Sequence, residues 1–271
     1  MFGCIEFNGE FRWLDVASGV AFLAMDLDER GRPDLARRFV SRMAAGLEGP
    51  GLRRLINFYE GERAQVRGGV GGLQADGDAV PLHERSRSRA AARHHYQWAL
   101  RYAVAGSAPL VVVVMGRPGT GKSTQAEAVA RALGWPHLAS DRVRKTHAGA
   151  ALHGRASART RRRLYTDTMT EATYATLRTR ARRAARQHRG TVLDATFSRR
   201  AQRDRLRTAL RAADVPYVFV ELTAPAPTLK QRLRRRSAGD ATASDARAGD
   251  FDMLTERYEA PDALEDPRHV K

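Results

Sequence analysis

A short glycine-rich stretch, Gly116–Ser123, constrains the fold of this chain more than any other part of its sequence. It reads Gly-Arg-Pro-Gly-Thr-Gly-Lys-Ser and satisfies the pattern G-x-x-x-x-G-K-[ST] of phosphate-binding loops. Glycines let successive backbone N–H groups turn inward and surround a polyphosphate. A valine-rich apolar run, Leu110–Met115, precedes the stretch, and an amphipathic helical pattern, Thr124–Leu133, follows it. This strand–loop–helix context favours a P-loop over an incidental glycine turn.

The residue types in the loop match the chemistry of nucleotide phosphates. Lys122 would place a positive charge against the terminal phosphates, and Ser123 would offer its hydroxyl to Mg²⁺. The N-terminus of the following helix adds partial positive charge to the same place. We therefore predict ATP and Mg²⁺ as cofactors, with the ATP phosphates held by Gly116, Arg117, Pro118, Gly119, Thr120, Gly121, Lys122, Ser123 and Thr124.

Strand and helix patterns alternate from Leu110 onward. The strand candidates are Leu110–Met115, His137–Ala139, Thr191–Asp194 and Tyr217–Leu222. Helical patterns lie between them at Thr124–Leu133, Ser157–Gln187 and Ala201–Ala212. Such alternation predicts an α/β fold with a parallel sheet, here of the P-loop NTPase or kinase type.

The N-terminal part is predicted to be mostly helical. Apolar residues recur at helical spacing from Val16 to Leu27 and from Leu35 to Met43, and Arg85–Tyr102 returns to a helical pattern. Between them a loop is expected, because glycines and a proline crowd together at Gly68, Gly69, Gly71, Gly72, Gly77 and Pro81. The expected organisation is a helical segment at 1–67, a linker and helix at 68–108, and the P-loop domain at 109–271.

Two carboxylates follow strand candidates and are candidate catalytic residues. Asp141 lies in Ser140–Lys145, where it would orient or deprotonate an acceptor hydroxyl, while Arg142 and Arg144 would neutralise developing charge. The alternative is that Asp141 only caps a helix. Asp194 ends a strand and would support Mg²⁺ or the acceptor; the alternative is an ordinary strand-end turn residue.

A basic helical pattern, Thr228–Arg236, follows the last strand candidate. Arginines on a mobile lid can close over phosphates and exclude water, so the basic residues of this pattern are candidate lid residues: Lys230, Arg232, Arg234, Arg235 and Arg236. The alternative is that they belong to the general arginine excess. The stretch Ala238–Asp250 that follows suits a flexible loop or a disordered linker.

The net charge of +17 raises the question of a nucleic-acid partner. Only four of the 47 basic residues are lysines, and aromatic residues are not interleaved with the eleven arginines of Arg155–Arg189 in a way that suggests base stacking. We favour a solvated helix face there, so nucleic acid is possible but not the favoured partner.

The single cysteine, Cys4, allows no intrachain disulfide. Met1–Glu10 does not resemble a signal peptide, and the longest uncharged run, Tyr102–Gly116, is too short to span a membrane. We expect a cytoplasmic location.

The chain resembles a bacterial family in which an aminoglycoside-phosphotransferase-like domain is fused to a P-loop kinase domain. At the front the resemblance rests on Cys4–Asn8, Phe11–Val16, Ala21–Asp26, Gly31–Ala36, Phe58-Tyr59 and Arg63–Arg67. At the back it rests on Met115–Thr124, Ala139–Lys145, Val192–Phe197, Leu229–Arg236 and Ser244–Ala246. It implies that Gly116–Thr124 holds the ATP phosphates, that Asp141 and Arg144 face the acceptor, that Asp194 supports Mg²⁺ or the acceptor, and that Arg232 and Arg236 belong to a lid.

Two departures from that family are visible. The nucleotide-binding lobe and the His-Gly-Asp loop that such a front domain carries are not in this sequence, and Gly3 stands where a metal-binding Asp is expected. The resembling kinase domains continue into another strand where this chain ends at Arg268–Lys271. The 1–67 segment is therefore expected to be the last helices of a phosphotransferase-like domain, and the chain looks truncated at both ends.

The leading hypothesis is a P-loop kinase that transfers the γ-phosphoryl group of ATP to a small-molecule acceptor. The first alternative is a nucleotide-binding remnant of a larger fusion with little or no catalysis. The second is a kinase or binder that acts on nucleic-acid ends. The fold does not choose among acceptors, so their identity stays open.

Overall fold

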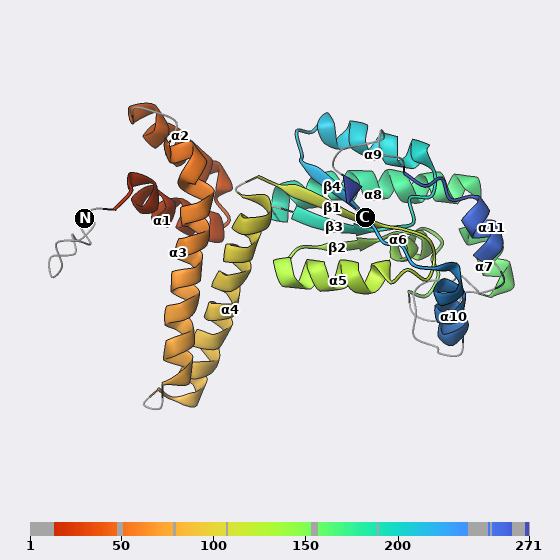
Figure 1. The fold of residues 1–271 in the computed structure, drawn as a ribbon, viewed down its shortest axis with the longest axis horizontal. Coiled ribbons are helices and arrows are strands. Elements are labelled where there is room, and N and C mark those ends of the chain that lie inside the picture. Colours follow the sequence, from red (N-terminus) through yellow and green to blue (C-terminus); the bar gives the residue numbers. More distant parts are fainter. Residues whose placement is uncertain are drawn as a thin grey trace. The chain divides into compact units, whose positions relative to one another are not determined.

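The computed structural model describes residues 14–47, 51–77, 80–106, 108–152, 157–188, 190–237, 249, 251–261 and 269–270. The chain divides into two compact units, Met1–Ser107 and Ala108–Lys271, and each is described by itself (Figure 1). Three sequence predictions fall outside the described residues: the resemblance at Cys4–Asn8 with Gly3, the resemblance at Ser244–Ala246, and most of the loop expected at Ala238–Asp250.

The first unit is helical, as predicted. Its helices are α1 (Val16–Glu29), α2 (Pro33–Gly46), α3 (Gly51–Asp76) and α4 (Leu82–Ala105). The side chain of Asp15 caps α1 by accepting a hydrogen bond from the Ala17 N–H at 2.8 Å, and Pro33 begins α2, where its missing N–H costs nothing. Although α3 and α4 are long, the described part of the chain contains no helix apolar enough to cross a membrane.

The prediction of a loop at the glycine-rich stretch is wrong for its first four glycines, whereas Gly77 and Pro81 do lie between α3 and α4. Helix α3 continues through Gly68, Gly69, Gly71 and Gly72 and lies side by side with α4 (Figure 1). A Cβ on Gly68 would lie 2.9 Å from the ring of Tyr96 on α4. At Gly71 it would lie 3.3 Å from the Ser88 carbonyl oxygen and from the Ala92 Cβ. Two of these glycines therefore serve close helix–helix packing, which outweighs their low helix propensity.

The second unit is built on a parallel sheet, which confirms the predicted α/β fold class. Its strands are β1 (Leu110–Met115), β2 (His137–Ala139), β3 (Gly190–Asp194), β4 (Tyr217–Glu221) and β5 (His269–Val270), in the spatial order β2-β3-β1-β4-β5. The first four coincide with the strand candidates of the sequence. The short β5, which pairs with β4 in parallel, was not predicted.

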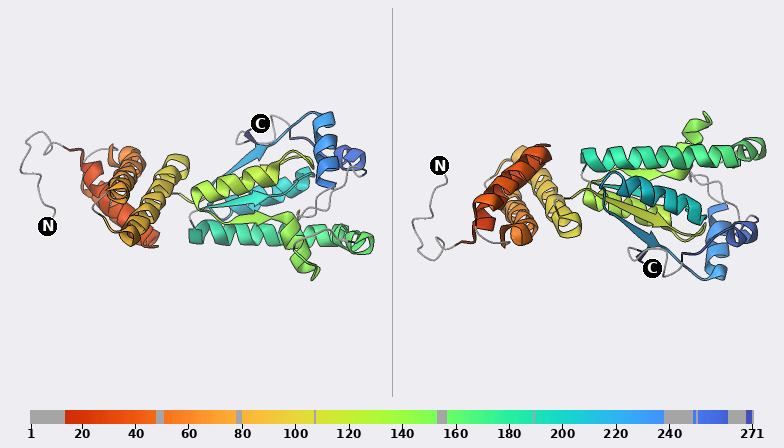
Figure 2. Two further views of the ribbon diagram at one scale, coloured as in Figure 1. Left: turned by 90° about the horizontal axis from the view of Figure 1, so that it is seen from below. Right: turned by 90° about the horizontal axis from the view of Figure 1, so that it is seen from above.

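Helices cover both faces of this sheet (Figure 2). Helix α5 (Lys122–Leu133) packs on one face against β1, β2 and β3, whereas α8 (Asp167–His188) and α9 (Arg200–Arg211) cover the other. Alternate residues of β1 supply the core beneath α8 and α9, where Val111 and Val113 meet Leu177 and Leu206. Because both faces of β1 are buried, the strand is apolar along its whole length.

The remaining helices lie beyond the carboxyl ends of the strands or beside them. They are α6 (Ser140–His147), α7 (Ala158–Leu164), α10 (Ala226–Ser237) and α11 (Phe251–Glu256). One continuous helix over Ser157–Gln187 was predicted, but α7 ends at Leu164 and α8 begins anew at Asp167. Thr166 explains the break, because its Oγ1 accepts a hydrogen bond from the Met169 N–H at 3.2 Å and so caps α8.

The packing of α3 on α4 predicts opposite effects for two alanine substitutions on one helix. Gly68→Ala should destabilise the first unit by about 1 kcal/mol, because the Tyr96 ring, which is 47% exposed, has to turn away from the new Cβ and loses its packing on α3. Gly72→Ala has no atom within 4 Å of its new Cβ and should stabilise the same helix by about 0.5–1 kcal/mol. Amide hydrogen exchange of α3 measures both changes.

Gly72→Ala is also the control for Gly68→Ala, since both replace a glycine within one helix by the same residue. Equal exchange rates in the two variants and the parent chain would contradict a helix packed closely through Gly68. A loop in this stretch would produce that result.

Candidate active site

The P-loop connects β1 to α5, and its backbone takes conformations that require glycine. Gly116, Gly119 and Gly121 have φ of +141°, +87° and +92°. L-residues with a side chain rarely adopt these values. Space imposes the same choice, because a Cβ on Gly116 would lie 2.4 Å from the Leu222 carbonyl oxygen. The glycines of the sequence pattern are thus explained by the geometry of the loop and its nearest neighbour.

Two side chains fix the loop from within the unit. Thr120 Oγ1 donates to the Arg117 carbonyl at 2.9 Å. Arg232, on α10, directs its Nη1 at the carbonyls of Gly119 (3.4 Å) and Thr120 (3.3 Å). The structure therefore brings the predicted lid residue Arg232 against the backbone of the loop, while the side chain of Arg236 lies outside the described part of the structure.

The loop opens onto a cavity of about 1130 Å³. This volume lies just above the usual range of ligand pockets, about 300–1,000 Å³. Helix α5 begins at this cavity, so its positive N-terminus faces the same space. The predicted site residues that line it are Pro118, Gly119, Gly121, Lys122, Ser123, Thr124, Asp141, Arg144 and Asp194. Gly116, Arg117, Thr120 and Arg232 are not among its lining residues.

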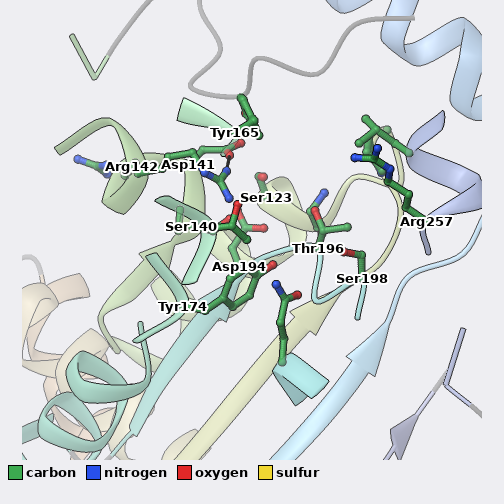
Figure 3. Close-up of a pocket in the computed structure, with 18 of the residues that line it drawn as sticks. Ser123, Ser140, Asp141, Arg142, Tyr165, Tyr174, Asp194, Thr196, Ser198 and Arg257 are labelled. Carbon is green, nitrogen blue, oxygen red and sulfur yellow. Dashed lines mark hydrogen bonds and ion pairs between the residues drawn. The ribbon is translucent and has the colours of Figure 1, made fainter. Parts of the chain in front are cut away.

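Asp194 is placed at the cavity by the sheet itself. It is the last residue of β3, in register with Val114 on one side and Ala139 on the other, and it is 4% exposed. Its Oδ2 lies 3.6 Å from His137 Nε2. Figure 3 shows Asp194 and Ser123 at the same cavity. Asp194 is thus a strand-end residue that also lines the cavity, and its role there stays a prediction.

Asp141 lies in the first turn of α6 and does not cap it. The N-cap position is Ala139, which makes no side-chain capping bond. Instead, Asp141 Oδ1 accepts a hydrogen bond from Arg144 Nη1 at 3.1 Å. The Arg144 guanidinium also stacks over the Tyr165 ring at 4.5 Å. Arg142 of the same helix also lines the cavity, and in Figure 3 its side chain extends away from Ser123.

A third group of cavity residues was missed by the sequence reasoning. Phe197 has φ of +45°, an uncommon conformation for a residue other than glycine. Its N–H donates to Tyr174 Oη at 3.1 Å, and its carbonyl accepts from Arg203 Nη1 at 2.7 Å. Burial raises the pKa of Tyr174, which keeps the phenol neutral. These bonds hold the β3–α9 loop, and Thr196 and Ser198 of this loop line the cavity. The sequence contains no motif that would have predicted these two residues.

The segment after α11 ties the same loop to β4. Tyr258 Oη donates to Glu221 Oε1 at 2.7 Å, and the Glu259 N–H donates to the Ser198 carbonyl at 2.8 Å. Burial and the bond to Glu221 raise the pKa of Tyr258, so this hydroxyl stays a donor. The carboxyl ends of β3 and β4 are thereby held together beside the P-loop.

Three lining residues carry buried polar atoms that have no hydrogen-bond partner among the described residues. They are Arg144 Nε, Gln202 Oε1 and His137 Nε2; Arg144 and Gln202 are 7% and 4% exposed. Buried polar groups are normally paired, so such atoms are candidates for contact with a ligand. Gln202, at the start of α9, was also missed, because a lone glutamine in a helix gives no signal in a sequence.

The donor set fits a nucleotide with a magnesium ion. Within the described ranges, no group of three His, Cys, Asp or Glu side chains is arranged to hold a metal alone. Mg²⁺ keeps waters and takes one or two protein oxygens together with substrate phosphates. The Ser123 hydroxyl and the Asp194 carboxylate, at one cavity with Lys122, are suitable residues for such an ion.

Comparisons with curated proteins find relatives that are much longer. An uncharacterized protein of Mycobacterium tuberculosis H37Rv and one of Mycobacterium bovis are each 37% identical over 150 residues, which covers 52% of this chain and 27% of each relative. The chain thus spans about a quarter of the length of the curated relatives it matches. The aminoglycoside-phosphotransferase-like fusion stays a prediction.

Similar solved structures include a gluconokinase from Sinorhizobium meliloti 1021, with 25% identity, coverage of 60% of this chain and 81% of that chain, and a TM-score of 0.42. Another is Chaetomium thermophilum Kti12 in complex with ADP-AlF3, with 18% identity, coverage of 59% of this chain and 87% of that chain, and a TM-score of 0.44.

A family model described as an AAA domain matches residues 111–261, which contain the P-loop, Asp141 and Asp194. This match spans more than half of the sequence, and the chain belongs to the AAA domain family.

Proposed function

We propose that this chain is an ATP- and Mg²⁺-dependent kinase that transfers the γ-phosphoryl group to a small-molecule acceptor. One observation carries the proposal: a single cavity joins the P-loop end of α5 to two carboxylates from other elements, Asp141 and Asp194. Phosphoryl transfer depends mainly on positioning and electrostatic stabilisation, and this cavity offers both.

The nucleotide end of the cavity is the P-loop. Backbone N–H groups around Gly119 and Gly121 and the N-terminus of α5 would surround the β- and γ-phosphates. Lys122 would contact their oxygens, and Ser123 and Asp194 would hold the ion. A bound Mg²⁺ would supply positive charge against the phosphate oxygens.

The acceptor end contains the Asp141–Arg144 pair. Asp141 would accept the proton of an acceptor hydroxyl while the hydroxyl oxygen forms its bond to the γ-phosphorus and the bond from that phosphorus to ADP breaks. The guanidinium of Arg144, 3.1 Å from Asp141 Oδ1, would orient the carboxylate toward the acceptor. Its stacking on Tyr165 holds that arrangement in place.

The direct test is a panel of hydroxyl-bearing metabolites with the purified protein, read as ADP release against a blank without acceptor. We expect ADP release that depends on one class of acceptor. Tight ATP binding without acceptor-dependent ADP across the panel would instead support a nucleotide-binding remnant. ADP release only with oligonucleotides would indicate a kinase of nucleic-acid ends.

Lys122→Ala should lower acceptor-dependent ADP release by about 100-fold or more, because it removes the charge that stabilises the transferring phosphate. The matched control is Lys230→Ala, which also removes one lysine but from an exposed ion pair with Asp252. Steady-state kinetics of both variants provide the measurement. Unchanged turnover in Lys122→Ala would refute the assignment of this loop.

Asp141→Asn should lower kcat about 100-fold or more while ATP binding is retained, because a general base of this kind contributes about 10²–10⁴-fold. Asp214→Asn is the control: it removes the same charge from an exposed turn with φ of +52°, a conformation that asparagine accepts well. Nucleotide titration and acceptor kinetics separate binding from transfer. An equal loss of ATP affinity and of turnover would argue that Asp141 supports the fold rather than the acceptor.

A further inference from the structure

The cavity carries more positive charge than the binding of a nucleotide requires. Seven basic side chains line it against four acidic ones: Lys122, Arg142, Arg144, Arg161, Arg162, Arg199 and Arg257 against Glu127, Asp141, Asp167 and Asp194. Lys122 belongs to the P-loop, and Asp194 would be neutralised by an ion. The excess therefore lies with the arginines, several of them on α6 and α7.

Arg144 is held in place but incompletely satisfied. Its side chain is 8% exposed, with Asp141 Oδ1 at Nη1 and the Tyr165 ring against the guanidinium plane. Its Nε is buried without a hydrogen-bond partner among the described residues. A buried guanidinium N–H without a partner is unfavourable, and an oxygen of a bound anion would satisfy it.

Arg162 brings a second positive charge to the same part of the cavity. It lies on α7, three residues before Tyr165, and it is exposed. No described carboxylate pairs with it: the acidic residue that follows α7, Asp167, accepts instead from Arg199 at 3.2 Å. Arg161 lines the cavity beside it. The wall formed by α6 and α7 thus presents guanidinium groups in excess of carboxylates.

We propose that this wall is an anion subsite, so that the acceptor carries a phosphate or carboxylate group in addition to the hydroxyl that receives the phosphoryl group. Arg144 and Arg162 would bind that group, since guanidinium matches the geometry of both anions. Asp141 and Arg144 lie one helical turn apart, which places hydroxyl and anion recognition side by side. This inference rests on the proposed kinase function for its acceptor, but the subsite itself can be tested without turnover.

The test measures binding of inorganic phosphate to the full chain while a non-hydrolysable ATP analogue and Mg²⁺ fill the P-loop. We expect the loaded protein to bind phosphate. Arg162→Gln, an exposed position, should weaken phosphate binding about tenfold or more, and Arg144→Gln should do the same. Arg183→Gln, an exposed arginine on α8 that does not line the cavity, is the control and should leave binding unchanged. Acetate, as a second probe, decides between a phosphate and a carboxylate group.

Absence of binding of either anion to the loaded protein would overturn the subsite proposal. An equal loss of phosphate affinity in Arg162→Gln and Arg183→Gln would overturn it as well. These outcomes are distinct from failure of the kinase proposal. If anions bind but the protein releases no ADP with any acceptor of the panel, the subsite proposal is supported and the kinase proposal is refuted. If neutral acceptors are phosphorylated while no anion binds, the kinase proposal is supported and the subsite proposal is refuted.

Discussion

The close approach of two backbone segments at Gly116 sets the geometry of the whole P-loop unit. A Cβ there would lie 2.4 Å from the carbonyl oxygen of Leu222, the residue that follows β4. The loop can therefore leave β1 beside β4 only where the chain has glycine. Because β1 is the central strand, β3 and β4 flank it in register, and Asp194 and Glu221 end level with the start of the loop. Asp194 and the P-loop are therefore positioned from this edge of the sheet.

Polar pairs outside the P-loop give the site its shape. On one side Asp141, Arg144 and Tyr165 form a hydrogen-bonded and stacked group from α6 and the end of α7. On the other, Tyr174 and Arg203 hold the backbone of Phe197 at both of its polar groups. A strained residue persists when its surroundings determine it in this way. The cavity between the two groups is therefore preformed by contacts that do not involve a ligand.

Glycine serves two different purposes in this chain, and sequence composition does not distinguish them. In Gly116–Ser123 the glycines adopt positive φ, and the pattern of the loop was sufficient to predict it. In α3 the glycines are helical, and Gly68 and Gly71 make room for α4. The loop prediction failed there because propensity describes the isolated chain, whereas the packed neighbour decides the cost of a side chain. The prediction of one continuous helix through Thr166 failed for a related reason. A capping hydrogen bond at Thr166 starts a new helix there, and hydrophobic periodicity does not reveal such a bond.

The sequence by itself determined the P-loop, four strands of the parallel sheet and the two carboxylates at their ends, because each depends on local pattern and on strand order. It left open whether Asp141 caps a helix or faces a ligand. In the tertiary structure Asp141 does not cap α6, because the N-cap is Ala139; it lines the cavity and pairs with Arg144. The structure also revealed the buried Arg144 Nε and Gln202 Oε1. Burial and pairing arise only when distant segments pack together, and that is information a linear pattern does not hold.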